Sequence, residues 1–331
     1  MSQQWTSKRF FVAVYTDISD SELREFLAAY DVGGLISVIG IAEGVENSNY
    51  LLLTERGRFI LTIYEKRVRR EDLPFFLDLM RHLSDKGVAC PTPVPARNGE
   101  TLHEIAGKPV AMVTFLEGVW PRRVWLEHCQ ALGTALADLH LAGQDFPGHR
   151  DNDLSLASFR PLFESSRARA DEVLAGLAES LDAELEVIAQ HWPTDLPSGV
   201  IHADLFPDNV FFNDGQVSGV IDFYFACNDC FAYDVAICLN AWCFEPDGDF
   251  NITKARSLLS SYRKRRAFSE AELAALPLLC RAAAMRFLLT RLHDWLHTPE
   301  DALVQPKDPL EYWRKLRFHR DVAGPGAYGL N

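Results

Sequence analysis

The sequence lacks several features that would place it in common classes of protein. It has no uninterrupted run of about 18 apolar residues, so no segment is expected to span a membrane. Residues 1–10 include Lys8 and Arg9 but no apolar segment typical of a secretory signal. Positive charge is also in deficit, because 33 Lys and Arg stand against 46 Asp and Glu, a formal net charge of −13. Since phosphate backbones attract basic surfaces, no nucleic-acid partner is expected.

Disulfide bonds are not expected either. The chain has seven cysteines, an odd number, and most stand among apolar residues, which is typical of reduced, buried thiols in the cytoplasm. Cys227 and Cys230 form a Cys-x-x-Cys pair, but structural zinc needs four ligands. Cys238 and Cys243 are five residues apart on a predicted helix and so do not share a face. A zinc site is therefore not predicted.

What the sequence does contain is a change of pattern near residue 116. The 331 residues, 48% of them apolar, suffice for about two domains. The first part alternates as strands do, with strands expected at 35–41, 50–54, 58–64 and 110–115. The second part has helical periodicity, with helices expected at 162–190, 233–243, 254–262, 271–297 and 309–319. The prediction is an α+β protein with a small β-rich lobe over 1–115 and a larger α-rich lobe over 116–331.

The residues that can carry chemistry are concentrated between Val200 and Phe223. This stretch contains His202-Ala-Asp204, then Asn209, a predicted hairpin over 210–221, and Asp222. Phosphoryl transfer needs a carboxylate that accepts the proton of the attacking hydroxyl, and an amide and a second carboxylate that hold Mg²⁺ on the nucleotide. The order predicts Asp204 as the base, and Asn209 and Asp222 as Mg²⁺ ligands, with ATP as the phosphoryl donor.

Other interpretations of single residues remain beside this one. A His-x-Asp alone also fits a self-capped loop, and only the ordered set favours a kinase. His202 is expected to fix the loop by packing and hydrogen bonding, with a direct acid–base role as the alternative. His293 and His297 imitate the spacing of a zinc protease motif, but a third ligand is not evident, and structural roles at a helix end are favoured.

The motif from His202 to Asp222 resembles the aminoglycoside phosphotransferase/choline kinase group, which has a bilobal, protein-kinase-like fold. The likeness runs from about Ala13 to Val322, and further stretches are similar to the bacterial homoserine kinases of that fold; they lie at 44–50, 64–67, 73–76, 220–227, 233–248 and 308–312. The resemblance implies ATP-dependent phosphorylation of the hydroxyl of L-homoserine, a step toward threonine. It also implies that Asp234 steadies the catalytic loop.

The resemblance further implies where the nucleotide binds. The backbone of the connector formed by Thr114, Phe115 and Leu116 is expected to hold adenine. The turn over 43–49 is expected to cover the phosphates, with Ser48 and Asn49 as candidate contacts, although a plain polar hairpin has the same pattern.

One departure from related kinases concerns the lysine of the third strand, which usually holds the α- and β-phosphates. Thr62 stands where this lysine is expected. Either Lys66 or Arg58 replaces it, or Mg²⁺ and the backbone hold the phosphates instead; Glu71 and Asp78 are the candidate partner acids.

An acceptor such as homoserine presents a carboxylate and an ammonium. An arginine fork suits the first and an acid suits the second. The candidates for the carboxylate are Arg286 and Arg291, and those for the ammonium are Asp229, Asn240 and Glu245.

Three alternatives to a homoserine kinase follow from the same residues. The fold could act on choline, a sugar or an aminoglycoside, and choline would favour an aromatic cage, for which Trp242 and Tyr224 are available. A nucleotide-binding regulator without catalysis and a zinc hydrolase on His293 and His297 are the others. The expected partner is a small molecule, and the chain is expected to be a monomer or a homodimer.

Overall fold

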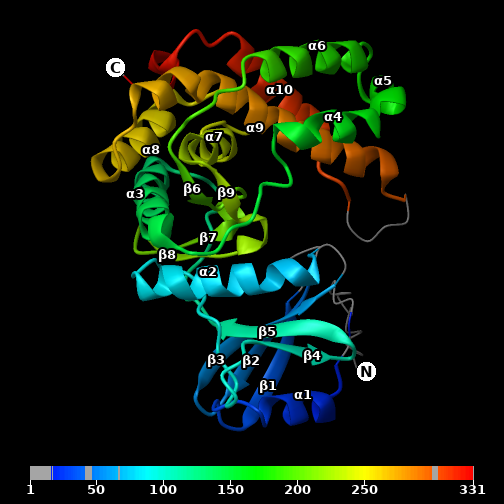
Figure 1. Ribbon diagram of the computed structural model, residues 1–331, viewed down its shortest axis with the longest axis vertical. Coiled ribbons are helices and arrows are strands. Elements are labelled where there is room, and N and C mark those ends of the chain that lie inside the picture. Colours follow the sequence, from blue (N-terminus) through cyan, green and yellow to red (C-terminus); the bar gives the residue numbers. More distant parts are fainter. Residues whose placement is uncertain (1–15, 17, 42–46, 66–67, 300–304, 331) are drawn as a thin grey trace, which may run out of the picture. The chain divides into compact units, whose positions relative to one another are not determined.

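The computed structural model describes residues 16, 18–41, 47–65, 68–299 and 305–330 (Figure 1). The chain divides into two compact units, one formed by Met1–Leu77 with Pro91–Phe115 and the other by Asp78–Cys90 with Leu116–Asn331. Residues 78–90, expected in the first lobe, therefore belong to the second unit. The reason is that His82 hydrogen-bonds Asp145 and that the backbone N–H of Val220 donates to Ala89.

The first unit is built on one antiparallel sheet with the strand order β1-β2-β3-β5-β4 (Figure 1). Its strands are β1 (Leu35–Ile41), β2 (Asn47–Thr54), β3 (Gly57–Tyr64), β4 (Leu102–Ile105) and β5 (Lys108–Thr114). Helix α1 (Asp20–Leu27) begins at Ser19, whose hydroxyl and the Glu22 side chain form a reciprocal capping box. Leu23 and Leu27 of α1 are buried in the same cluster as Leu52, Leu61 and Met112 of the sheet.

Helices make up most of the second unit. After α2 (Leu73–Asp85), whose second half belongs to it, come α3 (Leu126–Ala142), α4 (Leu156–Glu164), α5 (Ala170–Val173), α6 (Leu177–Gln190), α7 (Phe231–Trp242), α8 (Ile252–Arg265), α9 (Glu270–His297) and α10 (Pro309–Arg320). The four helices expected after residue 230 are confirmed. Helices also occupy most of 162–190, as expected: the end of α4, α5 and α6 lie there, and the chain turns before α6 at Gly176, which has a left-handed φ of 76°.

Two short sheets flank the motif residues of the second unit along the chain. Strands β6 (Ser198–Ile201) and β9 (Cys227–Cys230) pair with one another, and β7 (Val210–Asn213) pairs with β8 (Gln216–Val220). The predicted hairpin is confirmed: Asp214 and Gly215 both have left-handed φ, 48° and 76°, as a two-residue type I′ turn requires. The loop that holds Asp204 and Asn209 connects β6 of one sheet to β7 of the other.

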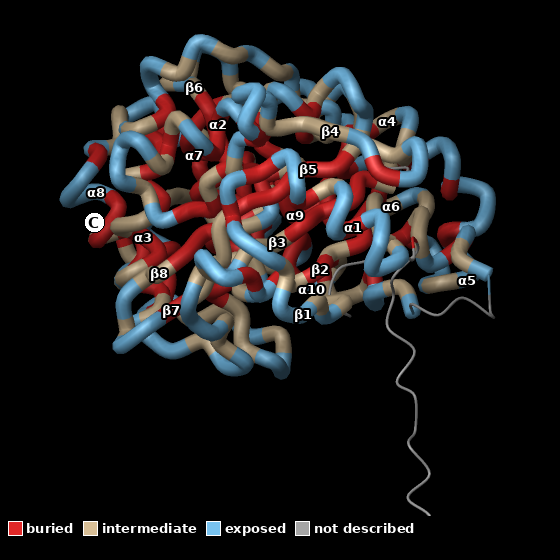
Figure 2. Tube along the Cα trace, turned by 90° about the horizontal axis from the view of Figure 1, so that it is seen from below, coloured by how far each residue is buried: buried red, intermediate tan, exposed pale blue. Residues whose placement is uncertain are grey.

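Helix α9 is the core helix of the second unit. It is long and apolar enough to cross a membrane by length and composition alone. However, it packs against α7 and α10, and Leu276, Leu279 and Leu288 are almost wholly enclosed (Figures 1 and 2). Its apolar character is that of a helix inside a folded unit.

Helices α3 and α8 also lie side by side (Figure 1), and a glycine stands where they cross. A Cβ atom at Gly133 of α3 would lie 2.1 Å from the carbonyl oxygen of Leu258 of α8. The crossing therefore requires a residue without a side chain at this position.

Candidate active site

The loop after β6 has a strained backbone at the residue before the predicted base. Ala203 has a φ of 62°, in the left-handed region, which costs a non-glycine residue about 1–2 kcal/mol. Asp234 of α7 holds the loop in this conformation, because its carboxylate accepts the N–H of His202 at 2.8 Å and that of Ala203 at 2.9 Å. The predicted role of Asp234 in steadying the catalytic loop is confirmed by these bonds.

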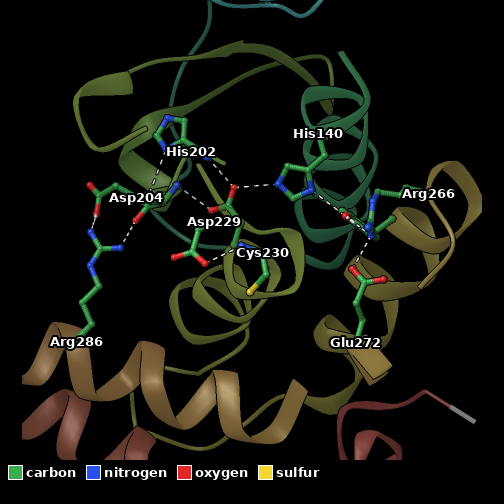
Figure 3. Close-up of polar contacts among 11 residues, drawn as sticks. His140, His202, Asp204, Asp229, Cys230, Arg266, Glu272 and Arg286 are labelled. Atoms are coloured by element: carbon green, nitrogen blue, oxygen red, sulfur yellow. Dashed lines mark hydrogen bonds and ion pairs between the residues drawn. The ribbon is translucent and has the colours of Figure 1, made fainter. Parts of the chain in front are cut away.

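Asp234 is itself held by a buried chain of polar side chains, of which Figure 3 labels His140, Arg266 and Glu272. His140 of α3 lies with Nε2 3.1 Å from Oδ2 of Asp234 and Nδ1 2.8 Å from the hydroxyl of Tyr262. A carboxylate only accepts, so Nε2 carries the proton and Nδ1 accepts from the tyrosine. Arg266 then donates to the Tyr262 oxygen at 3.2 Å and pairs with Glu272 at 2.9 Å.

His140 and Asp234 favour the protonation states that their hydrogen bonds need. Burial lowers the pKa of His140 and keeps its ring neutral. Burial alone would raise the pKa of Asp234, but the hydrogen bond from His140 and the bonds to the loop outweigh it and lower that pKa. Sequence reasoning missed His140; the only available signal was a histidine among the apolar residues of one helix face.

The buried ring of His202 also stabilises this loop through hydrogen bonds. Its ring is fully buried, Nε2 donates to the carbonyl of Ile221 at 2.9 Å, and Nδ1 accepts from the backbone N–H of Asp204 at 3.3 Å. Burial also lowers the pKa of His202. These contacts favour the structural role over direct acid–base chemistry.

The predicted base and one of the two predicted metal ligands lie close together in this loop. The side-chain amide of Asn209 donates to the carbonyl of Asp204 at 2.8 Å and approaches its Oδ2 at 3.4 Å. The amide oxygen is then the atom of Asn209 that can bind a cation. The backbone N–H of Ile221 donates to the carbonyl of Asn209 at 3.0 Å, which ties the loop to the strand end before Asp222.

Asp222 occupies a second strained position, with a φ of 64°. Strain of this kind is concentrated at functional sites. An amide oxygen and a carboxylate are hard oxygen ligands, and Mg²⁺ uses few protein groups because it keeps several waters. Asn209 and Asp222 therefore fit Mg²⁺.

Of the two arginines expected to bind a carboxylate, one faces the loop. Arg286 donates through Nη1 to the carbonyl of Ala203, and its Nη2 lies 4.0 Å from Oδ1 of Asp204 (Figure 3). Arg291 instead pairs with Glu311 at 2.6 Å and stacks over the ring of Tyr312. The structure thus gives Arg291 a role in joining α9 to α10.

The predicted ammonium ligands are occupied by other contacts. Asn240 is wrong as a substrate residue, because it is fully buried and donates to the carbonyls of Ala236 and Cys280 at 3.0 and 3.1 Å. Glu245 pairs with Lys254 at 2.6 Å. Asp229 is half-buried and accepts from Asn152 at 2.7 Å.

In the first unit, the described side chains expected to contact phosphate make hydrogen bonds to other residues. Ser48 is fully buried; its hydroxyl donates to Glu65 at 2.7 Å and accepts the N–H of Thr16, so it is wrong as a phosphate ligand. Asn49 accepts from Thr62 at 2.8 Å, which joins β2 to β3 at the position of the missing lysine. Lys66 lies outside the described residues, as does most of the turn over 43–49.

The connector expected to hold adenine coincides with the boundary between the units, since Phe115 belongs to the first and Leu116 to the second. Thr114 exchanges hydrogen bonds with Thr92 at 2.9 Å through its backbone N–H and its hydroxyl. The guanidinium of Arg58 stacks 4.5 Å from the ring centroid of Phe115. Arg58, one of the two candidate replacements for the lysine, thus contacts an aromatic ring of the connector.

The residues of the alternative interpretations have structural contacts of their own. Trp242 is fully buried and donates to the carbonyl of Leu205 at 2.7 Å, so it supports the catalytic loop and cannot line a choline cage. His293 contacts the Ser165 hydroxyl at 3.1 Å. Burial raises the pKa of the Cys230 thiol to about 12 and that of Cys227 as well, which disfavours metal-binding thiolates.

Comparison with known proteins agrees with this geometry. Residues 37–268 match the model of the phosphotransferase enzyme family. A homoserine kinase of Rhodospirillum rubrum is 60% identical over 97% of this chain and its own full length, and one of Nitrobacter hamburgensis is 63% identical over 96% of this chain and 98% of its own. An amicoumacin kinase solved with AMP-PNP and Ca²⁺ has the same fold, with a TM-score of 0.67, 18% identity and coverage of 92% of this chain and 93% of its own. The chain therefore belongs to the phosphotransferase enzyme family and, within it, to the group of the homoserine kinases.

Proposed function

We infer that the chain is a homoserine kinase, which transfers the γ-phosphoryl group of ATP to the side-chain hydroxyl of L-homoserine and forms O-phospho-L-homoserine in threonine biosynthesis. The observation that supports homoserine as the substrate is the identity of 60–63% with homoserine kinases over nearly the whole chain. The observation that supports the reaction type is the loop that brings Asp204 and Asn209 together next to Asp222.

The reaction is a direct transfer in this proposal. The homoserine oxygen attacks the γ-phosphorus, its proton passes to the carboxylate of Asp204, and ADP leaves with the electron pair of the broken bond. Asn209 and Asp222 would hold Mg²⁺, which neutralises charge on the β- and γ-phosphates when bound. The nucleotide-bound state of the amicoumacin kinase supports a nucleotide in this fold.

Choline is not supported as the acceptor, because Trp242, a candidate for its aromatic cage, is enclosed in the protein. All seven thiols are buried and none forms a disulfide, which suits a reducing compartment such as the cytoplasm. We propose a small-molecule acceptor and no macromolecular partner for catalysis.

Phosphate transfer from ATP to L-homoserine, with serine, choline and an aminoglycoside measured beside it, is the decisive assay. Preferred transfer to choline or to the aminoglycoside would overturn the assignment of substrate. In the Asp204→Asn variant we expect kcat to fall by a factor of about 100 to 10,000, because general base catalysis contributes that much, while ATP still binds. The control is Asp214→Asn, the same change in the hairpin turn, and near-normal turnover of Asp204→Asn would exclude Asp204 as the base.

A further inference from the structure

Arg286 of α9 stands apart from the other arginines of its helix because it reaches the catalytic loop. Its side chain is only 2% exposed. One guanidinium nitrogen donates to the carbonyl of Ala203, and another lies 4.0 Å from the carboxylate of Asp204 (Figure 3). A single planar group thus contacts both the residue before the base and the base itself.

The surroundings of Arg286 fix the orientation of its guanidinium. The group lies 4.6 Å from the ring centroid of Phe287 and 5.6 Å from that of Phe225. Its Nε atom makes no hydrogen bond to any residue that the structure describes. A buried cation needs a compensating charge, and Asp204 places a carboxylate at ion-pair distance. The rigid fork geometry of arginine then fixes where that carboxylate stands.

The backbone at Ala203 is held from two sides. Its N–H is accepted by Asp234 of α7 at 2.9 Å, and its carbonyl is held by Arg286 of α9. Because Ala203 is in the left-handed region, a loop without these partners would relax toward an ordinary conformation. Such a change would move Asp204, the next residue.

We propose that Arg286 is a positioning residue for the catalytic base: it fixes the loop at Ala203 and the carboxylate of Asp204, and it does not bind the carboxylate of the acceptor. The low exposure of its side chain leaves little surface for a substrate. This inference rests on the proposed function in one respect, namely that Asp204 is the base.

The test uses the Arg286→Lys variant and two acceptors. L-homoserine carries a carboxylate, whereas 3-aminopropan-1-ol is the same molecule without it. A positioning role predicts that kcat falls about 100-fold with both acceptors, as a displacement of about 1 Å does at a reacting group, while KM for homoserine stays within about threefold. An increase in KM for homoserine with unchanged kcat would overturn the proposal. A fall in kcat with homoserine but not with 3-aminopropan-1-ol would overturn it as well.

Slow hydrolysis of ATP by water provides a readout that does not depend on the acceptor. If the wild-type protein did not phosphorylate homoserine, the proposed function would fail, but hydrolysis in the wild type and in Arg286→Lys would still measure whether Arg286 supports Asp204. An equal rate of hydrolysis in both proteins would then contradict the positioning role of Arg286.

Arg281→Lys is the matched control. Arg281 stands on the same helix, is also largely buried, and pairs with Glu184 at 2.5 Å away from the loop. We expect its kcat to stay within about twofold of the wild type, since the contact that changes is the pair with Glu184 and not a contact to the catalytic loop. If Arg286→Lys did not fold, Arg286→Gln, which keeps a donor for the Ala203 carbonyl, would replace it. Failure of both variants to fold would overturn the proposal, because Arg286 would then serve the stability of the unit as a whole.

Discussion

Replacement of Asp234 by asparagine is the change that tests the catalytic loop most directly. The carboxylate accepts three hydrogen bonds, of which Oδ2 takes those from the backbone of His202 and the ring of His140, and Oδ1 takes that from the backbone of Ala203. Asparagine has one oxygen and one NH₂ group. In either orientation the NH₂ group faces a donor, so at least one bond is lost and the remaining ones lose their ionic character.

The expected cost follows from these bonds. A buried donor left without a partner costs about 1–3 kcal/mol, and two bonds that change from a charged to a neutral acceptor lose about 1 kcal/mol each. Asparagine is easier to bury than a carboxylate, which offsets part of this sum. We expect a net loss of about 3 kcal/mol in the free energy of unfolding, within the 5–15 kcal/mol of a typical domain.

The same change should slow catalysis. Without its acceptor, Ala203 can leave its strained conformation, and the shift of Asp204 is expected to lower kcat by about 100-fold. The assays are urea unfolding and ATP-dependent phosphorylation of homoserine, with Asp214→Asn in the exposed hairpin turn as the control. A variant with wild-type kcat and an unfolding free energy within about 0.5 kcal/mol of the wild type would refute the assignment of Asp234 as the support of the loop.

Two further predictions concern pH and metal. Burial lowers the pKa values of His140 and His202, and that of His319 to about 3, so below the unfolded value of about 6.5 the unfolded chain binds more protons and stability falls as pH falls. Each histidine contributes at most about 1.4 kcal/mol between pH 7.5 and 5.5, so urea unfolding should show a loss of up to about 4 kcal/mol in the free energy of unfolding; equal stability at both pH values would contradict this. In Asn209→Ala the Mg²⁺ concentration for half-maximal activity should rise at least about tenfold, and an unchanged titration would exclude Asn209 as a ligand.

Features that depend on a few neighbouring residues were accessible from the sequence. The capping box needs only Ser19 and Glu22, three positions apart, and the hairpin turn needs only Asp214 and Gly215. The catalytic loop was equally accessible, because the residue types that phosphoryl transfer needs follow one another over a short stretch. Short-range chemistry of this kind leaves a pattern that one sequence can show.

Contacts between distant segments left no such pattern. His140 and Asp234 are 94 positions apart, and nothing near either residue indicates the other. Arg286 and Arg291 are five positions apart on one helix, which turns them by about 140° relative to each other. Composition could not show which of them faces the loop. Asn240 was misassigned for a related reason: a polar residue inside a helix bonds to other helices as readily as to a ligand, and only burial distinguishes the two.

The close crossing of α3 and α8 at Gly133 has a consequence for the position of Asp204. From Gly133 to His140 is seven residues, two turns along the same face of α3, and from Leu258 to Tyr262 is about one turn of α8. The separation of the two helices at the glycine therefore sets the distance between the His140 ring and the Tyr262 hydroxyl, 2.8 Å. Through His140 and Asp234 that separation also sets the position of the peptide before the base. A residue with no side chain is thus part of what determines the position of Asp204, the proposed base.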